Sequence, residues 1–87
     1  SLFSLAVLIK EISKDQQVLC ITHQPFLAAG GLAHFKVNKN VINGITYTSI
    51  SKLTTKQQRK HELIELIGGG FGEANDYASR LLERAAA

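Results

Sequence analysis

The chain is 87 residues long and 45% apolar, which allows at most one small globular domain. Its formal net charge of +3 is too small to indicate nucleic-acid binding from charge alone. One cysteine cannot form an internal disulfide, which excludes a disulfide-stapled secreted mini-protein and favours a reducing, cytoplasmic location.

The apolar stretch at residues 1–9 is expected to be neither a signal peptide nor a membrane span. It has no initiating Met or basic residue before it, no small-residue cleavage site after it, and too few residues to cross a bilayer. A start without Met, inside an apolar helical pattern, suggests a piece of a longer protein. Because so short a chain buries only about 60 to 65% of its unfolded surface, we expect it to need partners.

Three elements are predicted in the first third of the chain. Apolar residues at helical spacing predict a helix over residues 2–14 that is apolar almost all round, which implies burial on more than one side and an exposed surface when the chain is alone in water. The β-favouring run at residues 18–22 predicts a central strand covered on both faces, with Cys20 as a small buried side chain. Pro25 fits the first turn of a short helix over residues 25–29.

A β-hairpin is predicted next. Residues 34–39 alternate apolar and polar side chains, residues 45–50 are rich in β-branched and aromatic ones, and Asn43-Gly44 lies between them. Residues 39–42 make the predicted loop longer than a two-residue turn, so the pattern leaves the register open.

Two helices complete the prediction. Thr54 or Thr55, each with a Gln three residues later, can cap a helix that ends at Gly68. Apolar residues at i, i+3, i+4 and i+7 predict an amphipathic helix over residues 73–85, and the two helices should form an αα-hairpin. The predicted fold class is α/β, in the order helix, strand, short helix, β-hairpin and two helices.

His23 is the leading candidate for chemistry because it follows the predicted strand, at the edge where open α/β sheets bind ligands. A neutral imidazole can donate to a phosphate oxygen or orient a water molecule. The alternative is a histidine that hydrogen-bonds to its own backbone. No G-x-x-x-x-G-K-[ST] phosphate loop and no acidic strand end occur in the 87 residues, so the site is one part of a larger one.

The motifs after residue 17 resemble the C-terminal end of the RecN family, bacterial DNA repair ATPases related to SMC proteins. The resemblance lies in the ordered combination of Thr-His-x-Pro at residues 22–25, a His-Phe strand from residue 34, and a helix ending in Gly-Gly at residues 68–69. A final helix closing on Ala-x-x-Leu-Leu extends the match to roughly residue 84. Gln24 and Phe26 depart from the family, which usually has an aliphatic residue and a glutamine there.

This resemblance implies the C-terminal part of a P-loop ABC/SMC-type ATPase head. Residues 1–87 would form a single partial domain lacking the Walker A loop, the signature motif and Walker B. His23 would be the catalytic, nucleotide-binding switch-loop histidine, which senses the γ-phosphate and helps to position the attacking water when two heads close over ATP.

The same resemblance implies the biological role and the partners. The intact protein would bind ATP and Mg²⁺ and repair DNA double-strand breaks by recombination, in the cytoplasm at the nucleoid. Its partners would be the remainder of the head, a second head in a homodimer, and DNA, with no membrane involved. The piece alone is expected to bind no cofactor and to be inactive.

The alternative function is a small binding module for nucleic acid or protein that uses a basic strip. Such a strip would comprise Lys36, Lys39, Lys52, Lys56, Arg59 and Lys60. Against it stands a solvated helix face on which Arg59 and Glu62 form an ordinary surface pair. A third possibility is a purely structural piece that associates through its apolar first helix.

Two further patterns favour structural roles. The Gly-rich residues 68–73 lack the lysine of a phosphate loop and follow a helix, so we expect a helix-to-helix turn. Cys20 and His23, with His34 and His61, lack the four convergent ligands of a structural zinc site, and no metal is expected.

Overall fold

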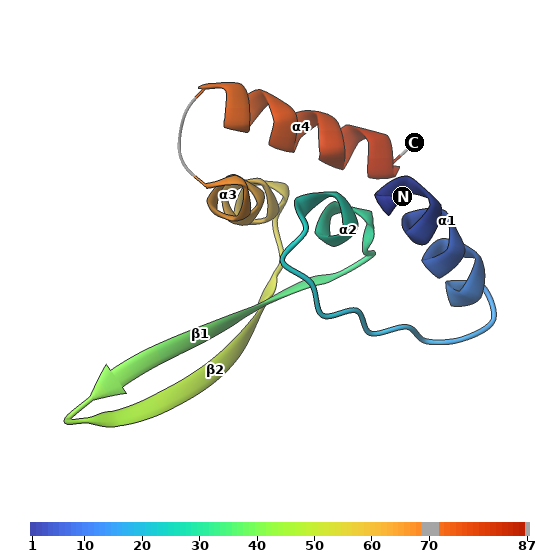
Figure 1. Ribbon diagram of the computed structural model, residues 1–87. Coiled ribbons are helices and arrows are strands. Elements are labelled where there is room, and N and C mark those ends of the chain that lie inside the picture. Colours follow the sequence, from blue (N-terminus) through green and yellow to red (C-terminus); the bar gives the residue numbers. More distant parts are fainter. Residues whose placement is uncertain (69–71, 87) are drawn as a thin grey trace.

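The computed structural model describes residues 1–68 and 72–86, which form a small helical assembly with a projecting β-hairpin (Figure 1). Helix α2 lies between α1 and α3, while α4 crosses above α2 and α3 (Figure 1). The elements are α1 (Leu2–Ser13), α2 (Pro25–Gly30), β1 (His34–Ile42), β2 (Ile45–Leu53), α3 (Lys56–Ile67) and α4 (Gly72–Ala86).

Helix α1 forms as predicted, but its apolar surface stays largely exposed. The Ser1 hydroxyl oxygen caps it by accepting a hydrogen bond from the Ser4 N–H at 3.2 Å. It packs against α2, yet no residue of α1 is buried in the described part of the chain, and Phe3 and Leu8 are 53% and 56% exposed. The apolar surface of α1 is therefore exposed in this chain, as expected for the chain alone, and burial on more than one side is not reached.

The predicted central strand at residues 18–22 does not form. This segment is irregular in secondary structure, Leu19 and Ile21 are 84% and 94% exposed, and Cys20 is exposed rather than buried. A strand requires a neighbour for its backbone hydrogen bonds. Within residues 1–68 and 72–86 the sheet consists of β1 and β2 alone, so the segment has β-favouring residues and no strand to pair with.

The hairpin forms with a tighter turn than predicted. Its antiparallel register runs from His34 opposite Leu53 to Ile42 opposite Ile45, so residues 39–42 belong to β1 and not to a loop. Asn43 and Gly44 make the two-residue turn with positive φ angles of 51° and 78°. Such turns match the twist of the paired strands, and Asn and Gly tolerate the left-handed conformation that they require.

The core lies where α2, α3 and α4 meet, and we call these three helices the helical corner. Leu63 of α3 is fully buried there. Helices α3 and α4 pack together as the predicted αα-hairpin. The capping box uses Thr55 with Gln58, and α3 ends at Gly68, whose φ of 110° lies in the left-handed region. The buried cluster comprises Ala29, Leu63, Ala78, Leu81 and Leu82.

Candidate functional site

The turn that carries His23 is fixed by hydrogen bonds on both sides. The Gln24 N–H donates to the Thr22 hydroxyl oxygen at 3.0 Å, which orders the backbone across His23. The Gln24 carbonyl accepts from the N–H groups of Leu27 and Ala28 at 3.1 and 3.0 Å, which starts α2. His23 therefore precedes a proline-started helix, as predicted, but it follows an irregular segment and not the predicted strand.

The His23 imidazole is exposed and accessible. It makes no hydrogen bond with any side chain or backbone group of the described residues, so the alternative of a self-bonded histidine is not what the structure shows. Both ring nitrogens can thus accept or donate to an incoming group.

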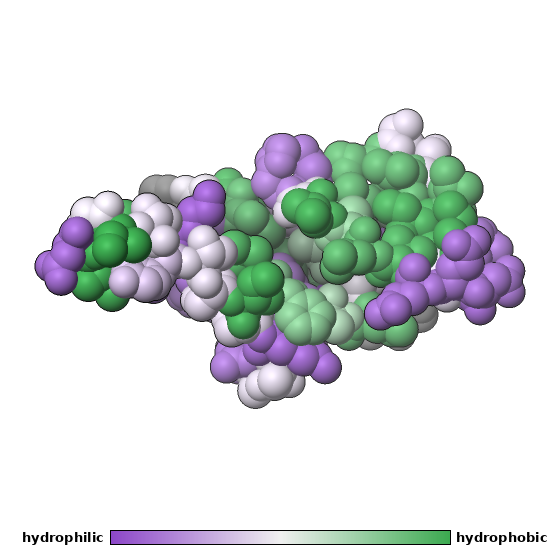
Figure 2. Space-filling model, turned by 90° about the horizontal axis from the view of Figure 1, so that it is seen from below, coloured by the Kyte–Doolittle hydropathy of each residue, from purple (hydrophilic) through white to green (hydrophobic). Residues whose placement is uncertain are grey.

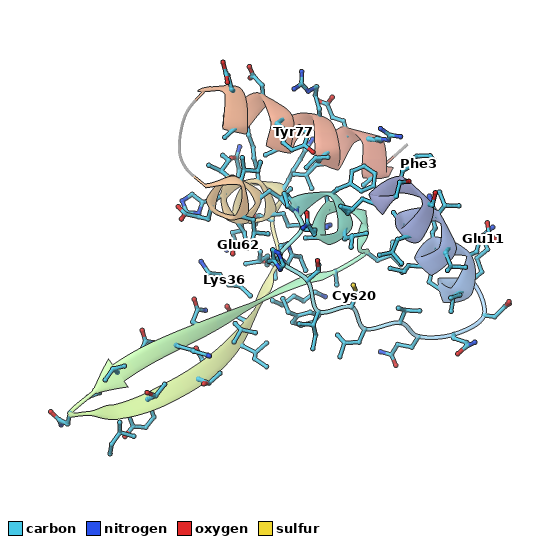
Figure 3. All side chains as sticks on the ribbon, in the orientation of Figure 1. Phe3, Glu11, Cys20, Lys36, Glu62 and Tyr77 are labelled. Carbon is cyan, nitrogen blue, oxygen red and sulfur yellow. The ribbon has the colours of Figure 1, made fainter. Side chains whose placement is uncertain are left out.

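A shallow hollow of about 260 Å³ lies beside this turn, at the start of α2. The Arg84 guanidinium lies over the rings of Phe3 and Phe26, at 5.1 and 5.6 Å from their centroids, and so links α4 to α1 and α2. Figure 3 shows Phe3 at the end of α1 nearest α4. Phe26 also packs on the core, which gives this departure from the family pattern a structural role.

Arg59 is the residue whose role sequence analysis missed. Its Nη2 donates to three backbone carbonyls at the end of α2 and just beyond it: Ala28 and Ala29, each at 3.3 Å, and Gly31 at 2.9 Å. The predicted surface pair with Glu62 is wrong, because α3 meets the end of α2 at this point. Unpaired carbonyls at a helix end are a general signal for such a partner, but the sequence does not say which cation reaches them.

Glu62 instead holds the base of the hairpin against α3. Its carboxylate accepts a hydrogen bond from Lys36 Nζ at 2.8 Å (Figure 3), which raises the pKa of Lys36. His34 begins β1 in the same region, and its Nδ1 is buried without a hydrogen-bond partner in the described chain. Burial, and then the charge of Arg59, lower the pKa of His34, while Glu62 acts in the opposite direction.

The six residues of the basic strip are divided among different surroundings. Lys36 is paired with Glu62, and Arg59 is engaged with backbone carbonyls. The hairpin register places Lys39 and Lys52 on one face and Lys36 on the other. A continuous cationic surface is therefore not formed, and the binding-module alternative loses the feature on which it rested.

A broad apolar surface covers one side of the molecule. Figure 2 shows apolar side chains gathered over the half of the lower face that lies under α1. We use the name exposed apolar surface for the exposed apolar side chains of α1 and of residues 18–22, among them Leu8, Leu19 and Ile21. Contiguous exposed apolar patches mark interaction surfaces or ligand-binding grooves.

Other candidate features contribute no site in the described residues. No three His, Cys, Asp or Glu side chains of residues 1–68 and 72–86 gather as metal ligands. His61 is exposed on α3, as expected. The centre of the Gly-rich segment, residues 69–71, lies outside the described residues. In the described part of the chain, no helix has the length and apolar character needed to cross a membrane.

Comparison with known proteins identifies the relatives of this chain. No family model matches it. It is 38% identical over 77 residues to the DNA repair protein RecN of Xylella fastidiosa (strain 9a5c), a match that covers 86% of this chain and 14% of that protein. The DNA repair proteins RecN of Synechocystis sp. and Bacillus subtilis are 37% and 36% identical over 97% and 76% of the chain, and 17% and 11% of their own lengths.

These matches place the chain with bacterial DNA repair proteins. More particularly, it corresponds to the C-terminal region of RecN. The chain spans about one-seventh of the length of the first relatives that it matches.

Proposed function

We propose that this chain is the C-terminal part of an ATPase head of the ABC/SMC type, in a protein that repairs DNA double-strand breaks by recombination. One observation carries the proposal: an exposed apolar segment without regular secondary structure leads directly into the ordered turn of His23. Strands buried on both faces of a parallel sheet have this composition. Neighbouring strands from the remainder of the head would pair with residues 18–22 and set His23 at the edge of the completed sheet.

His23 is proposed as the switch-loop histidine of that head. A neutral imidazole at this position donates one hydrogen bond to the γ-phosphate of ATP, while its other nitrogen can accept one from the attacking water. Phosphoryl transfer depends on such positioning and on charge stabilisation. The phosphate loop and the Mg²⁺ ligands would come from the remainder of the protein, because this chain contains no phosphate-loop motif. The chain alone would then hydrolyse no ATP.

The exposed apolar surface supports the same proposal. Residues of α1 and of the 18–22 segment are too exposed for a finished domain, and burying them on the remainder of the head would supply the missing second layer. The complete head would act as one of two in a homodimer, on DNA, in the cytoplasm.

Substitution of His23 in the full-length protein tests this function. His23→Ala should lower kcat for ATP hydrolysis by about a hundredfold, since a positioned group of this kind contributes about 10²- to 10⁴-fold. The matched control is His61→Ala, which removes an exposed histidine of α3 and should leave kcat unchanged within twofold. Nucleotide binding and melting temperature, measured on both variants, verify that the protein stays folded. Unchanged hydrolysis by a folded His23→Ala protein contradicts the assignment.

A further inference from the structure

We infer that Arg59 is the positioning residue for the His23 turn, acting through α2. The inference rests on the proposed function of His23 and adds a residue that touches neither nucleotide nor His23. It is drawn from the three carbonyls that one nitrogen of Arg59 contacts, at the opposite end of the helix that His23 precedes.

The contact joins distant parts of the chain. Arg59 lies in the second turn of α3, and its carbonyl partners lie 28 to 31 residues earlier. Guanidinium geometry suits the task, because its planar array of donors can satisfy several acceptors while its charge complements the negative end of a helix dipole. Helix α2 therefore has its last carbonyls held by α3 rather than by solvent.

Helix α2 is short enough to transmit this constraint. Its six residues span roughly 9 Å at the usual rise, and its N-cap, Gln24, directly follows His23. Ala29 near the end of the helix is buried in the core, and Phe26 in its first turn packs against the same core. With one face packed and the far end held by Arg59, the helix axis is fixed relative to α3, and so is the direction of the backbone that joins the helix to His23.

We call the three Arg59 contacts the clamp, and few other contacts hold this helix end: the Gly31 N–H donates to the Ala28 carbonyl at 3.4 Å. The end of α2 lacks a left-handed glycine cap, because Gly31 is extended with φ −72° and ψ 146°. Gly31 also allows close packing, since a Cβ built there would lie 2.9 Å from the Ala33 carbonyl oxygen. The buried Arg59 Nε has no hydrogen-bond partner in the described chain, so the Nη2 contacts are what holds the guanidinium in place.

The first measurement tests the clamp without reference to catalysis. Hydrogen–deuterium exchange by mass spectrometry on the full-length protein should show at least about tenfold faster exchange in the α2 peptide of Arg59→Met than in the wild type. Arg59→Lys, which keeps the charge on a smaller group, should give an intermediate rate. Arg80→Met is the matched control, because it removes an exposed arginine of α4 and should leave α2 unchanged. Unchanged α2 exchange in both Arg59 variants overturns the clamp.

The second measurement tests whether the clamp acts through His23. Arg59→Met should lower kcat for ATP hydrolysis by about tenfold with KM for ATP unchanged, yet by less than about twofold in a His23→Ala background. A structural loss of active protein would instead multiply with the His23 effect, and that result would overturn the positioning role. If Arg59→Met does not fold, the same cycle is measured with Arg59→Lys, whose smaller effect must vanish in the same way.

The two proposals fail in different ways. If His23→Ala leaves hydrolysis intact, the switch-histidine assignment fails, whereas faster α2 exchange in Arg59→Met still shows the clamp. If His23→Ala abolishes hydrolysis but Arg59→Met multiplies with it, the function stands and the positioning role is lost.

Discussion

The helical corner and the exposed apolar surface contain similar apolar residues, but these residues are buried in the corner and exposed on the surface. Leu63 in the corner is fully buried, whereas Leu19 on the surface is 84% exposed. The difference lies in layering: α3 and α4 cover each other and α2, while α1 and residues 18–22 have a partner on one side at most. Hydrophobicity predicts which residues can be buried, but a residue is buried only where a second layer of structure covers it.

Removing Leu63 is the strongest test of this contrast. Leu63→Ala should lower the free energy of unfolding by about 3 kcal/mol, because it leaves a cavity among Ala29, Ala78 and Leu82. The same change at the exposed Leu19 should cost less than about 0.5 kcal/mol. Urea denaturation followed by circular dichroism measures both. Similar costs at the two positions would mean that the surface segment is packed as tightly as the corner.

The start of α3 offers a second, smaller test, because it shows how far the corner depends on local signals. Thr55→Ala removes the side chain that accepts from the Gln58 N–H at 3.1 Å, and should cost about 1 kcal/mol. Gln57→Ala is the control, since the capping box uses Gln58 and Gln57 is exposed. Thermal melts of the two variants distinguish them. A larger loss of stability for Gln57→Ala than for Thr55→Ala would mean that Thr54, and not Thr55, caps α3.

His34 lies between the helical corner and the hairpin, and its protonation is expected to have the smallest effect on stability. Because burial and Arg59 hold its pKa below the ordinary 6.5, the unfolded chain takes up a proton first as the pH falls. The contribution of neutral, partly buried His34 to stability is therefore fully present above pH 6.5, and it is lost as the pH falls through the lower pKa of the folded state. Urea midpoints at pH 7.5 and 5.5 should differ more in the wild type than in His34→Gln. His61→Gln should behave like the wild type, and an equal pH dependence in all three proteins would refute this role of His34.

The local parts of the fold were predictable from sequence, and the non-local parts were not. The capping residues of α3, the helix that Pro25 starts and the hairpin around Asn43-Gly44 all depend on neighbouring residues, and each is present, although the turn is tighter than predicted. The strand at residues 18–22 failed because a strand is defined by its neighbours.

In the candidate site, too, the local features were predictable from sequence and the non-local ones were not. The helix that follows His23 was predicted, but the strand expected to place His23 at a sheet edge is not formed in this chain. Arg59 could not be assigned from its neighbours, because its carbonyl partners meet it only after α2 and α3 pack. A charged residue on a helical surface pattern is predicted to face solvent, and only the tertiary contact shows otherwise.

The tight Asn43-Gly44 turn also has a consequence for the order of folding events. The β1–β2 ladder can grow from its tight turn, where Ile42 lies opposite Ile45, so the hairpin can close within about 1 to 10 μs. The Arg59 contacts instead close a loop of about 30 residues and must wait for α2 and α3 to pack together. We therefore expect the β-hairpin to form early in folding, before the orientation of the His23 turn is fixed.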